Sequence, residues 1–172
     1  DHPDQVRLDG QVRELTVVFT DLAGFTTLSE RLQERTVPLL NDYMGRMVPI
    51  IRKHNGYVNK FLGYGMMFFY GAPQENTYHA SDAVTTVLEM RALMLEFNRE
   101  LAAGGLPEVL MRVGISSGEM VVGDAGSADA SDYTVLGDMV NLASRLESAN
   151  KVTGTKIMIN DRAAQLVGEL FL

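Results

Sequence analysis

The sequence predicts an α+β domain in which helices cover one face of a mostly antiparallel sheet, related to the ferredoxin-like βαββαβ plan. Short runs rich in β-branched and aromatic residues alternate with longer segments whose apolar residues recur every three or four positions. Two of the apolar runs flank the glycine-bracketed turn Gly63-Tyr64-Gly65, which is typical of a β-hairpin. The predicted order is strand, helix, helix, strand, strand, helix, strand, strand, helix, strand, helix.

The elements of the first half are predicted from apolar spacing and from turn residues. A strand at Leu15–Phe19 breaks at Asp21 and Gly24, and Thr26 or Thr27 is expected to cap the helix that follows. The remaining elements of this half are a helix after Pro38 that ends near Asn55, strands at 57–61 and 66–70, and a helix at about 78–101.

The second half alternates strand and helix patterns in the same way. Residues 123–132 are rich in Gly, Ala, Ser and Asp, so we expect a mobile surface loop there. The predicted elements are a strand at 109–115 followed by an apolar run at 120–122, a strand at 133–136, a helix at about 138–150, a strand at 156–159 and a last helix capped by Asp161.

Composition limits the classes of partner. The net charge of −7 argues against broad binding to nucleic acid, which needs a basic surface, and disfavours adhesion to an anionic membrane. There is no cysteine, so neither a disulfide framework nor a thiolate metal site is possible. No run of about 18 apolar residues is present that would insert this segment into a bilayer.

Asp21 is the first candidate for chemistry, because it follows a buried strand and precedes a glycine loop and a helix. Mg²⁺ prefers one or two carboxylates together with phosphate oxygens and water. The backbone N–H groups of Gly24, Phe25 and Thr26 at the helix start are suited to hold phosphates. On these local features alone, a helix-capping role for Asp21 is an equally good interpretation.

Three further segments favour the metal–nucleotide interpretation. Lys60 precedes the hairpin turn, and Thr134 lies just before the last long amphipathic helix. Asn141 and Arg145 are four residues apart on that helix, so they share a face and can contact the same ligand.

Together these motifs resemble the catalytic domain of class III adenylate and guanylate cyclases. The matching segments occur in the family's order over nearly the whole chain: Val18–Thr26, Asn59–Gly63, Arg112–Gly118 and Tyr133–Glu147. The resemblance implies a cyclase catalytic domain at 14–172 whose C-terminal hairpin is missing, and a lead-in from a larger protein at 1–13. It also implies a cytoplasmic location for this domain.

The resemblance implies an adenylate cyclase that converts ATP to 3′,5′-cyclic AMP and pyrophosphate at a dimer interface, with Mg²⁺ or Mn²⁺. In the family one subunit supplies the metal ligands and the other supplies the purine and transition-state contacts. The metal ligands would be Asp21 and the backbone carbonyl of Leu22.

Four further residues match the family's nucleotide contacts. Lys60 and Thr134 match the purine-selecting pair, Asn141 the residue that orients the ribose, and Arg145 the one that stabilises the reacting phosphate. Lysine carries only donors, so it suits N1 of adenine, which is an acceptor, and would clash with the N1–H of guanine. A threonine hydroxyl can donate or accept, so Thr134 alone is permissive.

Tyr64 departs from the family pattern, because the second metal-binding aspartate is expected at this position. A neutral phenol is a poor ligand for magnesium beside a carboxylate. Three explanations remain open: Tyr64 replaces an aspartate of the parent enzyme; the chain lends its other residues to a partner that supplies both metals; or the chain is a nucleotide-binding or dimerising signalling module. The partner is accordingly a second copy of the chain or another cyclase domain.

Overall fold

The computed structural model of the chain describes residues 10–171, and their side chains as far as Gly168. Residues 1–9 of the predicted lead-in lie outside this range, and Gln11–Arg13 form the start of the first strand. In chain order the elements are β1 (Gln11–Ala23), α2 (Phe25–Leu32), the short 3-10 helix η1 (Gln33–Arg35), α3 (Thr36–Lys53), β2 (Tyr57–Leu62), β3 (Gly65–Tyr70), α4 (His79–Ala103), β4 (Leu110–Gly126), β5 (Ser131–Leu136), α5 (Asp138–Thr153), β6 (Ile157–Ile159) and α6 (Asp161–Phe171).

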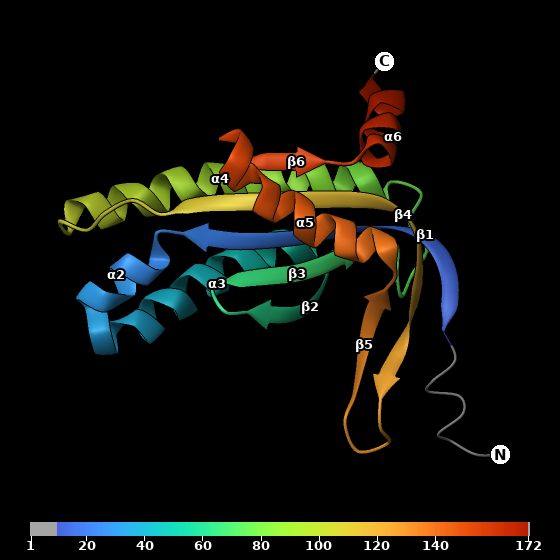
Figure 1. Ribbon diagram of the computed structural model, residues 1–172, viewed down its shortest axis with the longest axis horizontal. Helices are drawn as coiled ribbons and strands as arrows, with labels where there is room; N and C mark the ends of the chain where they lie inside the picture. The colour runs from blue at the N-terminus through green and yellow to red at the C-terminus, as the bar shows by residue number, and fades with distance from the viewer. Residues whose placement is uncertain (1–9, 172) are drawn as a thin grey trace.

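The predicted fold class and order of elements are confirmed. The sheet has the order β2-β3-β1-β4-β5, with every neighbouring pair antiparallel, and β6 adds to β4 as a short parallel strand. The central strand β1 pairs with β4 along its entire length, from Gln11 opposite Val122 to Ala23 opposite Leu110. β1 and β4 therefore form the frame on which the other elements are placed (Figure 1).

Helices cover both faces of this sheet, whereas the sequence interpretation placed them on one. Alternate residues of β1 enter two separate hydrophobic cores, with Val18 and Leu22 in one and Leu15 and Val17 in the other. Residues of α2, α3 and α4 fill the first core, and Val140 of α5 lies in the second. Figure 1 shows α5 crossing in front of β1 and β4 while α4 lies behind them. Both faces of β1 carry apolar side chains, because helices cover each face of the sheet.

Three local expectations were wrong. β1 continues to Ala23 instead of breaking at Asp21, because its ladder with β4 extends that far. The residue that precedes α2 is Gly24, with φ 86°, and neither Thr26 nor Thr27 caps the helix. The region 123–132 is mostly strand, because β4 runs through Gly126 and β5 starts at Ser131, so the connection between them is only the turn at 127–130.

The last helix also begins differently from the prediction. Asp161 is its first residue, and the side chain of Asn160 accepts a hydrogen bond from the backbone N–H of Ala163 at 3.0 Å. Asn160 also exchanges two hydrogen bonds with the backbone of Ser117 on β4. The cap therefore fixes the start of α6 to the central frame.

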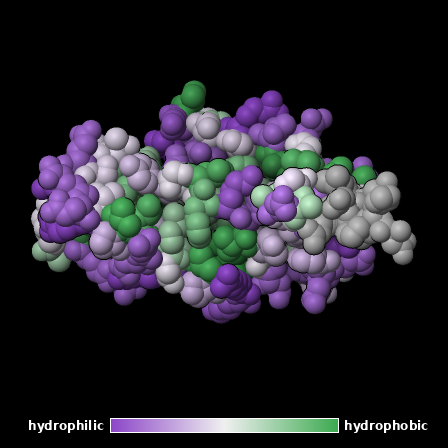
Figure 2. Space-filling view, turned by 90° about the horizontal axis from the view of Figure 1, so that it is seen from below, coloured by the Kyte–Doolittle hydropathy of each residue, from purple (hydrophilic) through white to green (hydrophobic). Residues whose placement is uncertain are grey.

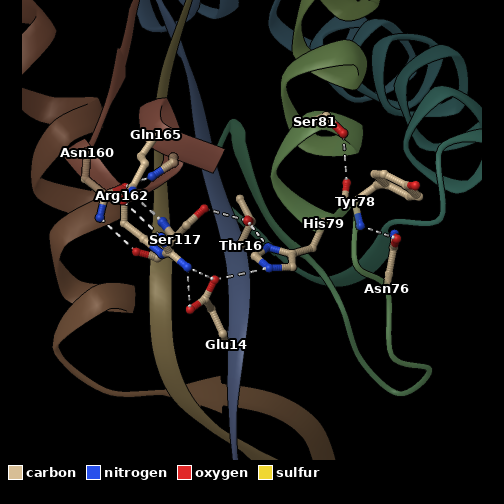
Figure 3. Close-up of polar contacts among 11 residues, drawn as sticks. Glu14, Thr16, Asn76, Tyr78, His79, Ser81, Ser117, Asn160, Arg162 and Gln165 are labelled. Carbon is tan, nitrogen blue, oxygen red and sulfur yellow. Dashed lines mark hydrogen bonds and ion pairs between the residues drawn. The ribbon is translucent and has the colours of Figure 1, made fainter. Parts of the chain in front are cut away.

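A buried polar network joins β1, β4 and α4 (Figure 3). The Thr16 hydroxyl lies 2.6 Å from Nδ1 of His79 and 2.6 Å from the Ser117 hydroxyl. Nε2 of His79 lies 3.7 Å from the Glu14 carboxylate, which also pairs with Arg162 of α6 at 3.0 Å. Because burial penalises the imidazolium form, the pKa of His79 is lowered below 6.5, although Glu14 acts in the opposite direction.

The network predicts a loss of stability in mild acid. The unfolded chain binds a proton at His79 more readily than the folded chain, so the free energy of unfolding should fall as the pH drops below 6.5. Urea denaturation across this range should show a steeper fall for the parent chain than for His79→Gln, which cannot titrate. Parallel pH profiles for the two proteins would contradict this.

A second prediction concerns the contact between α5 and β4. A Cβ on Gly114 would lie 2.1 Å from the carbonyl oxygen of Ala143 and 2.5 Å from the backbone nitrogen of Glu147, so Gly114→Ala must push the helix outward. We expect this change to destabilise the chain by about 2 kcal/mol in chemical denaturation. Gly45→Ala is the matched control, because its Cβ would meet nothing within 4 Å on an exposed helix, and it should stabilise by up to about 1 kcal/mol. Equal stability of the two variants would rule out the close-packing argument.

Candidate active site

Asp21 lies near the end of β1, directly opposite Arg112 of β4. Its side chain is half-buried, and Oδ1 accepts a hydrogen bond from the N–H of Leu22 at 2.9 Å. It does not cap α2, which has no side-chain cap at all. The helix-capping alternative for Asp21 is therefore wrong, and the carboxylate is available for another role.

The predicted phosphate-binding segment follows within three residues. Gly24 adopts a left-handed conformation that turns the chain from β1 into α2, and its carbonyl accepts the first helical hydrogen bond, from Leu28 at 3.2 Å. Phe25 is fully buried and anchors the turn, while Thr26 is exposed. The N–H groups of the first helical turn have no intrahelical acceptor, so they remain free to bind an anion beside Asp21.

Tyr64 occupies the turn between β2 and β3 and lies close to Asp21. A Cβ on Gly65 would lie only 3.2 Å from the Cα of Asp21, so the hairpin turn packs against this part of β1. The Tyr64 ring packs on Phe25, with 4.6 Å between ring centroids, and borders the hydrophobic core. The side chain at position 64 is therefore held by aromatic packing.

The described residues fit one divalent cation better than two. Asp21 offers a carboxylate and Leu22 a backbone carbonyl, which are suitable ligands for magnesium when nucleotide phosphates complete the shell. Among the side chains of residues 10–168, no group of three or more acidic or histidine residues is arranged to hold a metal ion. Position 64, where the resemblance implies the second carboxylate of a two-metal site, carries the phenol of Tyr64.

The structure adds two residues that the sequence interpretation left without a role. Nε of Arg112 and Oε2 of Glu147 are both buried without a hydrogen-bond partner among the described residues. Burial raises the pKa of Glu147, the negative charge of Asp21 raises it further, and Arg112 and Lys151 oppose the shift. Asp21, Arg112 and Glu147 therefore interact electrostatically. The β1–β4 register brings Arg112 opposite Asp21, and the close packing of α5 on β4 brings Glu147 beside them. Arg112 begins a motif already recognised in the sequence.

A second group of residues comes from β2 and β5, which are the two ends of the strand order. Asn59 connects them: its amide nitrogen donates to the carbonyl of Tyr133 at 2.8 Å, and its amide oxygen accepts from the Thr134 hydroxyl at 3.1 Å. Tyr57 packs on both Phe69 and Tyr133, with ring centroids 4.9 and 5.4 Å apart. The sheet thus curls until its two edges meet beside Thr134.

Lys60, Asn141 and Arg145 are all exposed. None of them forms an ion pair or a side-chain hydrogen bond with the described part of the chain. Asn141 and Arg145 lie one turn apart on α5, as predicted, and the backbone N–H of Asn141 bonds to the carbonyl of Gly137. The structure brings Asp21, Gly24, Phe25 and Tyr64 together, and separately Asn59 and Thr134, but no hydrogen bond or ion pair connects the two groups.

Comparison with known proteins identifies the family. The family model described as the adenylate and guanylate cyclase catalytic domain matches residues 9–170. Adenylate cyclase 1 of Rhizobium meliloti is 38% identical over 147 residues, which is 85% of this chain and 22% of that protein. The adenylate cyclase of Anabaena cylindrica is 31% identical over 87% of this chain and 30% of its own length. The chain therefore spans less than a third of the length of these relatives.

Solved structures agree with the sequence matches. The adenylyl cyclase CyaB from P. aeruginosa superposes with a TM-score of 0.86 at 37% identity, over 94% of this chain and 84% of that one. The guanylyl cyclase Cya2 gives a TM-score of 0.83 at 35% identity, over 93% and 81% of the two chains. The similarity extends to enzymes named for either purine, so it identifies the fold and the family without selecting the nucleotide. This chain belongs to the family of adenylate and guanylate cyclase catalytic domains.

Proposed function

We propose that this chain is an adenylate cyclase catalytic domain, whose site for converting ATP to cyclic AMP and pyrophosphate forms between two chains packed head to tail. The separation of the two residue groups carries the proposal. Asp21 and the start of α2 form one half of a site, while the exposed Lys60, Asn141 and Arg145 have no side-chain partner among the described residues of the same chain. Among those residues, the Thr134 hydroxyl is bonded only to Asn59. A second chain related by a two-fold axis would complete both halves.

The first half of the site binds the triphosphate. Asp21 and the carbonyl of Leu22 would hold Mg²⁺ or Mn²⁺ with the phosphates, and the N–H groups at the start of α2 bind phosphate oxygens. When bound, the metal lowers the pKa of the attacking hydroxyl and stabilises charge on the phosphate. Arg112 lies opposite Asp21 and adds a positive charge to the phosphate end of the site.

The second half holds the nucleoside and the reacting phosphate. Lys60 donates to N1 of adenine, and Thr134 contacts the exocyclic group of the base. Asn141 orients the ribose so that its 3′ oxygen faces the α-phosphate. Arg145 stabilises the charge that develops there, a role that in phosphoryl transfer is worth about 10³-fold in rate or more.

An exposed apolar surface supports the dimer. Phe61 and Leu62, at the end of β2, are 56% and 45% exposed. Figure 2 shows the side of the molecule on which β2 lies, where hydrophobic atoms gather near the centre of the face. Such residues on an edge strand are typical of an interface. We place the partner as a second copy of this chain or another cyclase domain.

The setting of the reaction follows from the substrate and from the charge of the chain. ATP is abundant in the cytoplasm, which is where we place the domain. Every helix within residues 10–171 falls short of what a bilayer crossing requires. The net charge of −7 is unsuited to nucleic acid, so the proposed ligand is a mononucleotide with its metal.

Tyr64 favours a second candidate function. Its packing on Phe25 shows that the fold accommodates the aromatic ring at this position. A chain with one metal-binding carboxylate would serve as the nucleotide-binding partner in a heterodimer, or as a signalling module that binds ATP without turnover. We therefore expect weak turnover, or none, from a homodimer of the chain as it stands.

Restoring the second carboxylate should restore activity. Tyr64→Asp should raise cyclic AMP formation with Mg²⁺ or Mn²⁺ by about 10²-fold or more, since a metal contributes several kcal/mol to the stabilisation of the transition state. Tyr64→Asn is the matched control, because asparagine has nearly the same shape as aspartate but no charge. This variant should remain as inactive as the parent. Robust turnover by the unaltered chain would show that the second carboxylate is not needed.

Complementation should show that the site is shared between chains. In the Tyr64→Asp background, Asp21→Ala and Arg145→Ala should each abolish most activity alone. Refolding the two variants together gives mixed dimers with one intact site, so activity should recover to about a quarter of that of the Tyr64→Asp protein if pairing is random. No recovery, with dimers present by sedimentation, would contradict a site built from two chains.

A further inference from the structure

A β-bulge in β2 gives Asn59 an unusual position. Val58 lies opposite Phe68 and Lys60 lies opposite Met67, so Asn59 is the extra residue between them and has no partner in the ladder. Bulges change the direction in which a side chain points. Here the side chain of Asn59 reaches β5, the strand at the other end of the sheet.

The chemistry of its neighbours fixes the orientation of the Asn59 amide. Its nitrogen lies 2.8 Å from the carbonyl oxygen of Tyr133 and 3.2 Å from a carboxylate oxygen of Asp132. Both of these atoms can only accept hydrogen bonds, so the NH₂ group must face them. The amide oxygen is then the atom that faces Thr134, 3.1 Å from its hydroxyl.

This orientation determines where the Thr134 proton lies. A hydroxyl has a single proton, and here that proton is donated to the amide oxygen of Asn59. Only the lone pairs of the Thr134 oxygen remain for a ligand. Thr134, which as an isolated residue is permissive, is thereby restricted to accepting a hydrogen bond.

We propose that Asn59 is a positioning residue that makes Thr134 an obligate acceptor and so favours purines with an exocyclic amine at C6. The 6-amino group of adenine donates to such an acceptor, whereas the 6-oxo group of guanine is itself an acceptor and is repelled. The inference rests on the proposed function, because it assumes that Thr134 contacts the purine. The selectivity for ATP then depends on Asn59 and Asp132 as well as on Lys60.

Competitive binding to the unaltered chain tests the proposal. Displacement of a fluorescent N-methylanthraniloyl-ATP by ATP and by GTP gives the ratio of the two affinities. Asn59→Ala should lower the preference for ATP by about tenfold, the value of one well-placed hydrogen bond. Thr134→Val should do the same, and the double variant should lose no more than either single change, because Asn59 acts through Thr134.

Two further variants separate hydrogen-bond polarity from structural support. Thr134→Ser keeps a hydroxyl that donates to the Asn59 amide oxygen, so it should retain the preference for ATP. Asn98→Ala removes an asparagine that links α4 to the chain before β4 through two hydrogen bonds to Val109, and it should leave the ratio unchanged.

The outcomes distinguish this inference from the proposed function. If the parent chain binds neither nucleotide, or does not prefer ATP, the proposed function fails, and the role of Asn59 fails with it. If the parent prefers ATP and Asn59→Ala keeps that ratio, or weakens both nucleotides equally, only the role of Asn59 is overturned.

Discussion

The antiparallel pairing of β1 with β4 is the constraint on which the rest of the structure depends. It fixes thirteen residues of β1 against β4, and alternate side chains of β1 fill the two cores on either side of the sheet. The same pairing places Arg112 opposite Asp21 at one end. At the other end β4 continues past β1 into its hairpin with β5, which carries Thr134. One ladder therefore positions both halves of the proposed site.

Much of the fold could be predicted from the sequence, because its signals are local. The hairpin around Gly63 and Gly65 and the amphipathic spacing of α3 and α5 each depend on residues close together in the chain. The end of β1 and the extent of β4 could not be predicted in this way. Gly and Asp within residues 123–126 favour a loop, but pairing with β5 overrides that preference.

In the candidate site, too, local sequence signals were predictable and long-range contacts were not. Asp21, Lys60, Thr134, Asn141 and Arg145 were found through motifs that are contiguous in the sequence. The interactions around them depend on residues that are distant in sequence: Arg112 is near Asp21 only through strand register, and Asn59 meets Thr134 across 75 positions. Tyr64 was recognised as an exception from its motif, but its packing on Phe25 required the folded chain. Motifs identify the candidate ligand-binding side chains, whereas the groups that orient them require tertiary structure.

The bulge at Asn59 also affects how this chain tolerates insertions and deletions. Side chains alternate between the two faces of a strand, so the removal of one residue from a regular strand reverses the facing of everything on one side of the deletion. Asn59 is an exception, because Val58 and Lys60 already lie opposite the consecutive residues Phe68 and Met67. Its loss would make the ladder regular without changing the facing of Lys60, and it would remove the side chain that joins β2 to Tyr133 and Thr134. A chain without this one residue would keep the alternation of β2 and would change only the atom to which the Thr134 hydroxyl donates its proton.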